Sequence, residues 1–208
     1  MIYDFMSARR SIRRFKAEAP PRAMLEQLIA AAITAPSASN KQPWRFLMVS
    51  NAAVKQQMAA LIRAAVERTA QKITPGFEES FRAYGDYFTR FEGAPVVIVP
   101  LFRPLTLLSN MVEPGLKESE QSDIEVMEMY SGLVSVSLAV QNLLLMAQEL
   151  GLGASGMTGP LIARSELKHL LAVPPSWDIA AVIPVGFPDE TPDPKPRKPV
   201  AQVIKWIE

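Results

Sequence analysis

Residues 122–150 read SDIEVMEMYSGLVSVSLAVQNLLLMAQEL and contain no proline. Small residues recur along this stretch at spacings of three and four, at Gly132, Ser135, Ala139 and Asn142. That spacing gathers them on one side of a helix, where they permit the close approach of a neighbouring element. We therefore predict one long helix from Ser122 to Leu150. Its small-residue stripe would pack either against a second subunit or against the core of its own chain.

The same stretch raises the question of a membrane span. Tyr130 to Gln148 carries no charged residue, and its length approaches the roughly 20 residues that cross a bilayer. Polar side chains interrupt it throughout, and glutamates stand at both ends, so a helix buried in a soluble protein explains it better. The N-terminal residues 1–15 lack an apolar core of signal-peptide length. We expect a cytoplasmic protein without membrane contact.

Shorter patterns complete the outline. Helices are predicted at residues 3–9, from Pro20 to about residue 33, and at 52–70, 73–90 and 163–171. Strands are predicted at residues 46–49, 96–99 and 179–185. Residues 103–123 follow neither period and indicate a loop or lid. Because helices outnumber the strands and separate them along the chain, we predict a single α+β domain over residues 1–208.

Composition excludes several classes of function. The chain has 208 residues and a formal net charge of +1, so no broad attraction to nucleic acid follows. It has no cysteine, which excludes disulfides, thiol nucleophiles, zinc fingers and cysteine-held iron–sulfur clusters. Its one histidine, His169, rules out a multi-histidine metal site and is expected on a helix surface. We expect no metal site.

Two basic clusters stand near opposite ends of the chain. Residues 9–14 read RRSIRR, and residues 195–198 read KPRK. Guanidinium groups offer planar, forked donors that suit phosphate. The two clusters could therefore converge on one phosphorylated ligand, although either alone could equally be a solvated run of charge.

Two loops have compositions suited to a ligand. Residues 35–46 read APSASNKQPWRF, which offers a flat wall with a few donors for a planar ring. The alternative is an ordinary connection with Trp44 in the core. Residues 151–160 read GLGASGMTGP, with four glycines that let backbone N–H groups approach a ligand. This second loop follows a helix and lacks GK[ST], so it is neither a dinucleotide fingerprint nor a P-loop.

Taken in order, these segments resemble the nitroreductase family of flavin enzymes over nearly the whole chain. The matching pieces include residues 9–13, 35–44 and 151–159, then Pro184–Phe187 followed by 195–197. The resemblance implies an α+β sandwich with a mixed central sheet flanked by helices. It also implies an intertwined homodimer with one FMN at each of two interface sites.

The resemblance also implies roles for particular residues. Those holding the FMN phosphate and ribityl chain would be Arg9, Arg10, Ser11, Lys195 and Arg197. Arg13 would lie near the pyrimidine edge of the flavin ring. The partner subunit would cover that ring with Pro36, Ser37, Ala38, Ser39 and Asn40. The region of flavin N5 would be lined by Met157, Thr158 and Gly159.

The implied activity needs no catalytic side chain, because the flavin carries the redox chemistry. NADH or NADPH would reduce FMN, and an electrophilic small molecule such as a nitroaromatic or quinone would reoxidise it. One alternative is oxygen-dependent destruction of the flavin to a benzimidazole. The run Ser39–Trp44 resembles the reductases more closely. Another alternative is a flavin-binding or phosphate-binding protein without turnover.

Overall fold

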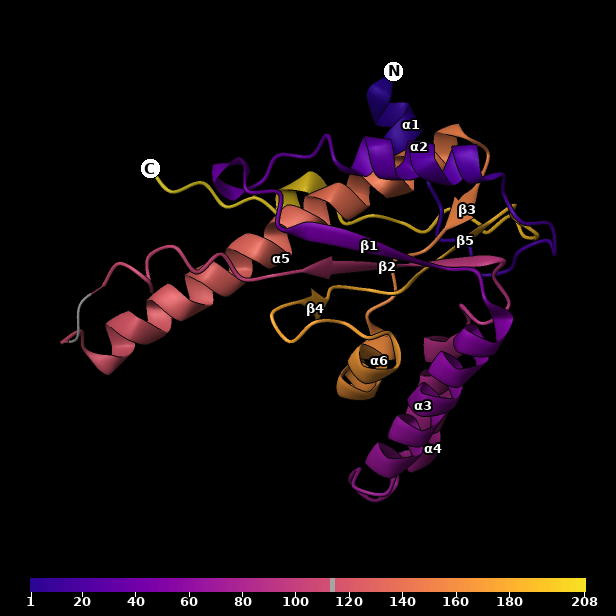
Figure 1. Ribbon diagram of the computed structural model, residues 1–208. Helices are drawn as coiled ribbons and strands as arrows, with labels where there is room; N and C mark the ends of the chain where they lie inside the picture. Colours follow the sequence, from indigo (N-terminus) through magenta and orange to yellow (C-terminus); the bar gives the residue numbers. More distant parts are fainter. Residues whose placement is uncertain (113–114) are drawn as a thin grey trace.

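The computed structural model describes residues 1–112 and 115–208. A five-stranded sheet forms its centre, in the order β1–β2–β5–β3, with β4 paired to the end of β2 (Figure 1). The strands are β1 Trp44–Val49, β2 Val96–Phe102, β3 Gly153–Ala154, β4 Asp178–Ile179 and β5 Ile183–Gly186. The predicted α+β fold is confirmed. Every described strand pair is antiparallel, so the strand directions are not mixed.

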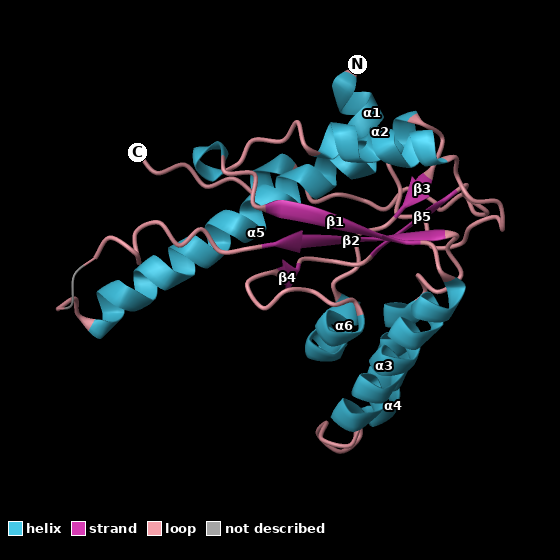
Figure 2. Cartoon of the chain, viewed as in Figure 1, coloured by secondary structure: helices cyan, strands magenta, loops and turns pink. Residues whose placement is uncertain are grey.

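Helices cover both faces of the sheet (Figure 2). Two of them, α2 and the long α5, lie on one face, and α3, α4 and α6 lie on the other. The helices are α1 Ile2–Ala8, α2 Arg22–Ala32, α3 Ala52–Ala70, α4 Glu78–Gly85, α5 Glu118–Glu149 and α6 Arg164–Leu170. Three short 3₁₀ helices lie between them along the chain, η1 Ala38–Asn40, η2 Asp86–Thr89 and η3 Gly159–Ala163, and a fourth, η4 Val200–Gln202, follows β5.

Strand β2 separates two hydrophobic cores. All seven of its residues are buried, and successive side chains of a strand point to opposite faces of a sheet. Val97, Val99 and Leu101 accordingly join the core with α3 and α6. Alternate residues of the same strand, including Ile98, join the core with α2 and α5.

The predicted strand at residues 179–185 is wrong as one continuous element. In β2, Leu101 pairs with Ile179 and Ile98 pairs with Ile183. Three residues, 180–182, therefore lie opposite only two residues of β2, 99–100. One extra residue in a strand is a β-bulge, which bends the strand and interrupts pairing. The interruption falls at Pro100, which has no N–H to donate to the ladder. The segment therefore divides into β4 and β5.

The small-residue stripe of α5 packs against its own chain. Ser135 and Ala139 are buried, and a Cβ added to Gly132 would lie 2.2 Å from the carbonyl oxygen of Arg103. Asn142 donates to the carbonyl of Ala31 at 3.4 Å, in α2. The sequence allowed the stripe to pack either against a second subunit or against its own chain. The structure shows that it packs against the core of its own chain.

Helix α5 also begins four residues earlier than Ser122, at Glu118. The predicted loop at 103–123 is therefore shorter, and its residues 113–114 lie outside the described residues. By length and composition α5 passes the test for a membrane span. Its small-residue stripe is covered by α2 and β2, while most of its apolar stretch, including Tyr130 and Val134, is exposed.

Replacing Gly132 with alanine should destabilise the fold by about 1–3 kcal/mol, because the added methyl meets backbone that has to shift. The free energy of unfolding in urea measures the effect. The control is Ser137→Ala, an exposed position on the same helix, which should change the stability little. An unchanged stability in Gly132→Ala, with only the oligomeric state altered, would contradict the packing.

Candidate functional site

The arginine-rich segment at residues 9–14 is held against β3 and against the chain that follows β5. Ile12 N–H donates to the carbonyl of Ala154 at 3.1 Å, and Asp189 N–H donates to the carbonyl of Arg14 at 3.0 Å. Gly153 makes this approach possible, because a Cβ there would lie 2.6 Å from a methyl of Ile12. The glycine of β3 thus has a packing role and fixes where the arginines lie.

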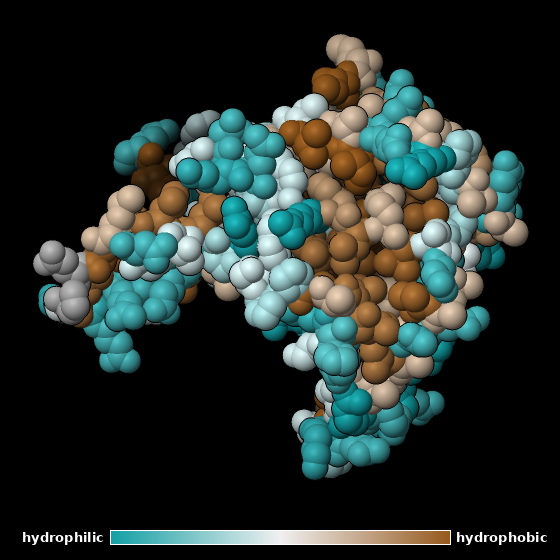
Figure 3. Space-filling view, viewed as in Figure 1, coloured by the Kyte–Doolittle hydropathy of each residue, from teal (hydrophilic) through white to brown (hydrophobic). Residues whose placement is uncertain are grey.

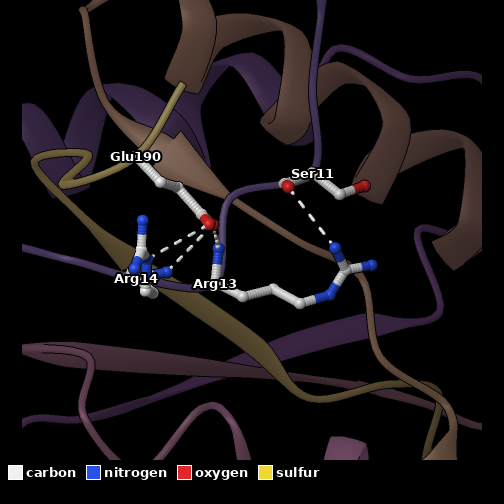
Figure 4. A network of polar contacts seen from close by, with 4 residues as sticks. All are labelled: Ser11, Arg13, Arg14 and Glu190. Atoms are coloured by element: carbon white, nitrogen blue, oxygen red, sulfur yellow. Dashed lines mark hydrogen bonds and ion pairs between the residues drawn. The ribbon is translucent and has the colours of Figure 1, made fainter. Parts of the chain in front are cut away.

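Glu190 fixes the same segment from the other side (Figure 4). Its carboxylate accepts hydrogen bonds from the N–H groups of Arg13 at 2.5 Å and Arg14 at 3.0 Å, and it pairs with the Arg14 side chain at 3.5 Å. Burial raises the pKa of Glu190, but these two hydrogen bonds, together with the positive charges of Arg14 and Arg13, outweigh burial and leave the pKa below its ordinary value. The Arg13 side chain extends away from Glu190 toward the carbonyl of Ser11 (Figure 4).

The C-terminal basic cluster lies within electrostatic reach of the N-terminal one. Burial lowers the pKa of Arg9, and the positive charges of Arg197 and then Arg10 lower it further. Such an effect requires the C-terminal Arg197 to lie close to Arg9. Arg10 is oriented by its bonds to the carbonyls of Ser7 and Arg9, at 2.8 and 3.0 Å. The fold therefore concentrates positive charge where the two ends of the chain cross.

A cavity of about 410 Å³ opens beside these arginines. Its wall includes Arg9, Arg10, Gly151 and Glu190. The Glu190 carboxylate is engaged by the backbone N–H groups of Arg13 and Arg14 and by the Arg14 side chain. Lys195 is exposed on the tail that carries Arg197. The arrangement suits a ligand with a phosphate group.

The loop that contains Pro36 to Asn40 has an unusual backbone. Ser39, Asn40 and Gln42 all have left-handed φ, at 50°, 50° and 46°, which costs energy for residues other than glycine. Hydrogen bonds compensate: Gln42 N–H donates to the Ser37 hydroxyl at 3.0 Å, and Ala38 N–H to the Ser135 hydroxyl of α5 at 3.3 Å. In Figure 1 this loop lies at the opposite end of the sheet from residues 9–14. Within one chain the two predicted groups of site residues are not brought together.

In the glycine-rich loop at residues 151–160, some residues pack in the core and others are exposed. Met157 is buried in the core and exchanges backbone hydrogen bonds with Val182, so its side chain does not reach solvent. Gly159 leaves room for the ring of Phe88, because a Cβ added at Gly159 would lie only 2.2 Å from a ring carbon of Phe88. Thr158 is exposed between them. The buried hydroxyl of Ser155 has no hydrogen-bond partner among the described residues.

Sequence reasoning missed Glu190, and it placed Ser135 in the small-residue stripe without predicting its contact with Ala38. Both residues position the predicted site residues without being ligands themselves. Glu190 acts on backbone N–H groups 176 and 177 residues away, and no motif reports such a contact. The one signal in the sequence that could have indicated this role is that Glu190 is an acidic residue a few positions before the basic cluster at 195–198.

Replacing Glu190 with glutamine should destabilise the protein at pH 7 by about 1–3 kcal/mol, because the two N–H donors then meet a neutral amide oxygen, a weaker acceptor than a carboxylate, and the ion pair with Arg14 is lost. The pKa of Glu190 is lowered on folding, so its contribution is present above the unfolded-state pKa and is lost as the pH falls through the folded-state value. Urea unfolding at several pH values should show the difference from wild type disappearing in acid. Asp189→Asn, an exposed neighbour, is the charge-matched control; an equal loss there would refute the assignment.

Comparison with known proteins agrees with this architecture. A sequence model described as the Nitroreductase family matches residues 6–187. An iodotyrosine deiodinase of Thermotoga neapolitana is 32% identical over 204 residues, which are 98% of this chain and 96% of that protein. An NADH dehydrogenase of Thermus thermophilus is 27% identical, over 95% of this chain and 92% of that protein. The crystal structure of an iodotyrosine deiodinase bound to FMN and 3-iodo-L-tyrosine has a TM-score of 0.75, 26% identity and full coverage of both chains. The chain therefore belongs to the nitroreductase family.

Proposed function

We propose that this protein is an FMN-dependent oxidoreductase. NADH or NADPH is the electron donor, and an electrophilic small molecule such as a nitroaromatic or a quinone is the acceptor. The observation that carries the proposal is the cavity walled by Arg9 and Arg10 together with residues of the 188–192 segment, with the positive charge of Arg197 acting on Arg9. FMN, when bound, supplies the hydride and electron transfer, so the chain needs no cysteine or catalytic histidine.

The basic cluster fits the phosphate end of FMN. A phosphate dianion beside Arg9 and Arg197 would offset the repulsion that lowers the pKa of Arg9. Forked guanidinium donors bind phosphate oxygens in pairs, and Arg10, Ser11 and Lys195 would complete the contacts to the phosphate and ribityl chain.

Arg13 is proposed to act at the ring end. Its backbone is fixed by Glu190, while its guanidinium bonds only weakly to the Ser11 carbonyl at 3.5 Å. A fixed positive charge at the pyrimidine edge stabilises the negative charge that develops there on reduction. Thr158 and Gly159 would approach N5, and Met157 would support them from the core.

A second copy of the chain is proposed to complete each site. The loop from Pro36 to Asn40 is remote from the arginines of its own chain (Figure 1), so it would serve the partner's flavin. It borders a groove of about 670 Å³ whose other wall is the apolar side of α5. Tyr130 and Val134 in that wall are 60% and 56% exposed.

Figure 3 shows hydrophobic surface along the projecting α5 and over the edge strand β1. The C-terminal tail adds exposed apolar residues: Val200, Val203, Ile204, Trp206 and Ile207. Contiguous apolar surface of this kind is rare on monomers and typical of subunit interfaces. These features support a homodimer in which the partner covers the apolar side of α5. We propose that this dimer is soluble and cytoplasmic.

Reductive removal of iodide from iodotyrosine is a second candidate. The specific observation is the 32% identity to an iodotyrosine deiodinase across nearly the whole length of both chains. In this reaction the C–I bond of the phenol ring breaks and a C–H bond forms; the reduced flavin would supply two electrons and one proton, and iodine leaves as iodide.

The proposed function predicts flavin absorbance in the purified protein and bleaching by NADH or NADPH without oxygen. Nitrobenzene, a quinone and 3-iodotyrosine, added separately, would then identify the acceptor by the return of the oxidised spectrum. Conversion to a benzimidazole in oxygen would indicate the flavin-destroying alternative. Absence of bleaching by either donor would contradict the proposal and favour a binding protein.

The phosphate contacts are tested in the same assay. Arg9→Ala and Arg197→Ala should each lose FMN while the protein stays folded, since one charge-assisted hydrogen bond contributes about 1.5–3 kcal/mol. The control is Arg22→Ala, an exposed arginine on α2. Full occupancy in both variants, measured by the ratio of flavin to protein absorbance, would refute the phosphate assignment.

The dimer is tested by Val134→Glu, which places a charge in the exposed apolar side of α5. We expect a monomer that has lost FMN, because the loop from Pro36 to Asn40 of the partner is withdrawn. Sedimentation over a dilution series, read at the flavin wavelength, measures both. Gln71→Glu, exposed at the end of α3, is the control. A monomer that retains FMN would rule out the shared site.

A further inference from the structure

A second basic cavity lies at the other end of the sheet. It has a volume of about 450 Å³ and is bordered by Lys41, Arg103 and Ser176 together with residues 104–107. Lys41 comes just before β1, Arg103 just after β2, and Ser176 just before β4. Antiparallel pairing of Trp44 with Phe102, and of Phe102 with Asp178, brings these three chain segments to one edge.

Positive charge gathers at this edge without a carboxylate partner. The guanidinium carbons of Arg45 and Arg103 lie 4.4 and 5.5 Å from the ring centre of Trp177. Stacking on an aromatic ring orients an arginine while leaving its in-plane donors available. Among the described residues, no ion pair involves Arg45, Arg103 or Lys41.

The walls of this cavity are fixed. Arg103 N–H donates to the carbonyl of Pro43 at 3.2 Å, and the Arg103 carbonyl rests against Gly132. The wall at residues 104–107 is anchored through Glu128, which is 3% exposed. Its backbone carbonyl accepts from Leu105 N–H at 3.2 Å, and its carboxylate accepts from Leu108 N–H at 2.7 Å. A cavity with walls held in this way does not have to be ordered by the ligand, which favours binding.

We propose that this cavity binds the diphosphate of the nicotinamide dinucleotide donor. The proposal rests on the proposed function. Lys41 directly follows the loop from Pro36 to Asn40, which would cover the flavin ring. In a dinucleotide only one ribose separates the nicotinamide from the diphosphate, so a donor at that ring carries its negative charge close to this loop. Lys41 and Arg103 supply the opposite charge, and Ser176 supplies a hydroxyl donor.

The test begins with binding to the FMN-loaded protein, in which the flavin phosphate already occupies the Arg9–Arg197 cluster. Inorganic pyrophosphate and NADP⁺ are titrated calorimetrically. We expect both to bind wild type and to bind Lys41→Gln and Arg103→Gln roughly tenfold more weakly, the loss expected for one charge-assisted contact. Arg103→Lys should recover part of the affinity. The controls, Lys72→Gln and Arg22→Gln, remove exposed charges elsewhere and should bind as wild type does.

A kinetic arm connects the cavity to the donor. The second-order rate constant for anaerobic flavin reduction is measured with NADPH and with 1-benzyl-1,4-dihydronicotinamide, which has no phosphate. The ratio of the two constants should fall about tenfold in Lys41→Gln and Arg103→Gln and stay constant in the controls.

Three results would overturn the proposal. The first is no pyrophosphate binding by the wild-type protein, and the second is equal affinity in all variants. The third is an unchanged NADPH ratio together with a KM that rises for 4-nitrobenzoate but not for nitrobenzene, which would assign the cavity to an acceptor carboxylate. Failure of the proposed function is distinguishable, because it shows in the wild type as absent flavin or as flavin that neither donor bleaches.

Discussion

The burial of β2 on both faces is the constraint on which the rest of the molecule depends. Its side chains supply both hydrophobic cores, so helices have to cover both sides of the sheet. Its two ends also locate the basic regions. At one end Phe102 leads to Arg103 and the cavity beside Trp177. At the other, Val96 pairs with Val185 in β5, the strand that continues to Glu190 and the arginine cluster.

The two basic regions use different physical means to keep positive charge in place. Near the crossing of the chain ends, backbone pairing and one engaged carboxylate hold the arginines close enough for their charges to repel. At the opposite end, an indole ring holds two arginines by their faces. The net charge of +1 conceals both arrangements, because it averages over a surface on which charges are strongly localised.

Local patterns in the sequence predicted the helices better than the strands. The predicted helix at 52–70 coincides with α3, because Asn51 caps its first turn and the apolar spacing is regular. The split between β4 and β5 was not predictable in this way, since it depends on Pro100 in a different strand. For the site, residue types suggested the basic clusters and the loops. The contact with Glu190 and the distance of the Pro36–Asn40 loop depend on tertiary structure, which spacing along the chain does not encode.

The contact between Arg13 and Glu190 joins residues 177 positions apart. Closing such a long loop carries a larger entropic cost than any local element, and contacts of high sequence separation form slowly. The contact also requires every residue from Arg13 to Glu190 to have left the ribosome. During synthesis α2, α3 and β1 are available for packing long before residues 187–197 emerge. The backbone of Arg13 and Arg14 is therefore fixed only after Glu190 has been synthesised, so this cluster takes its final geometry late in folding.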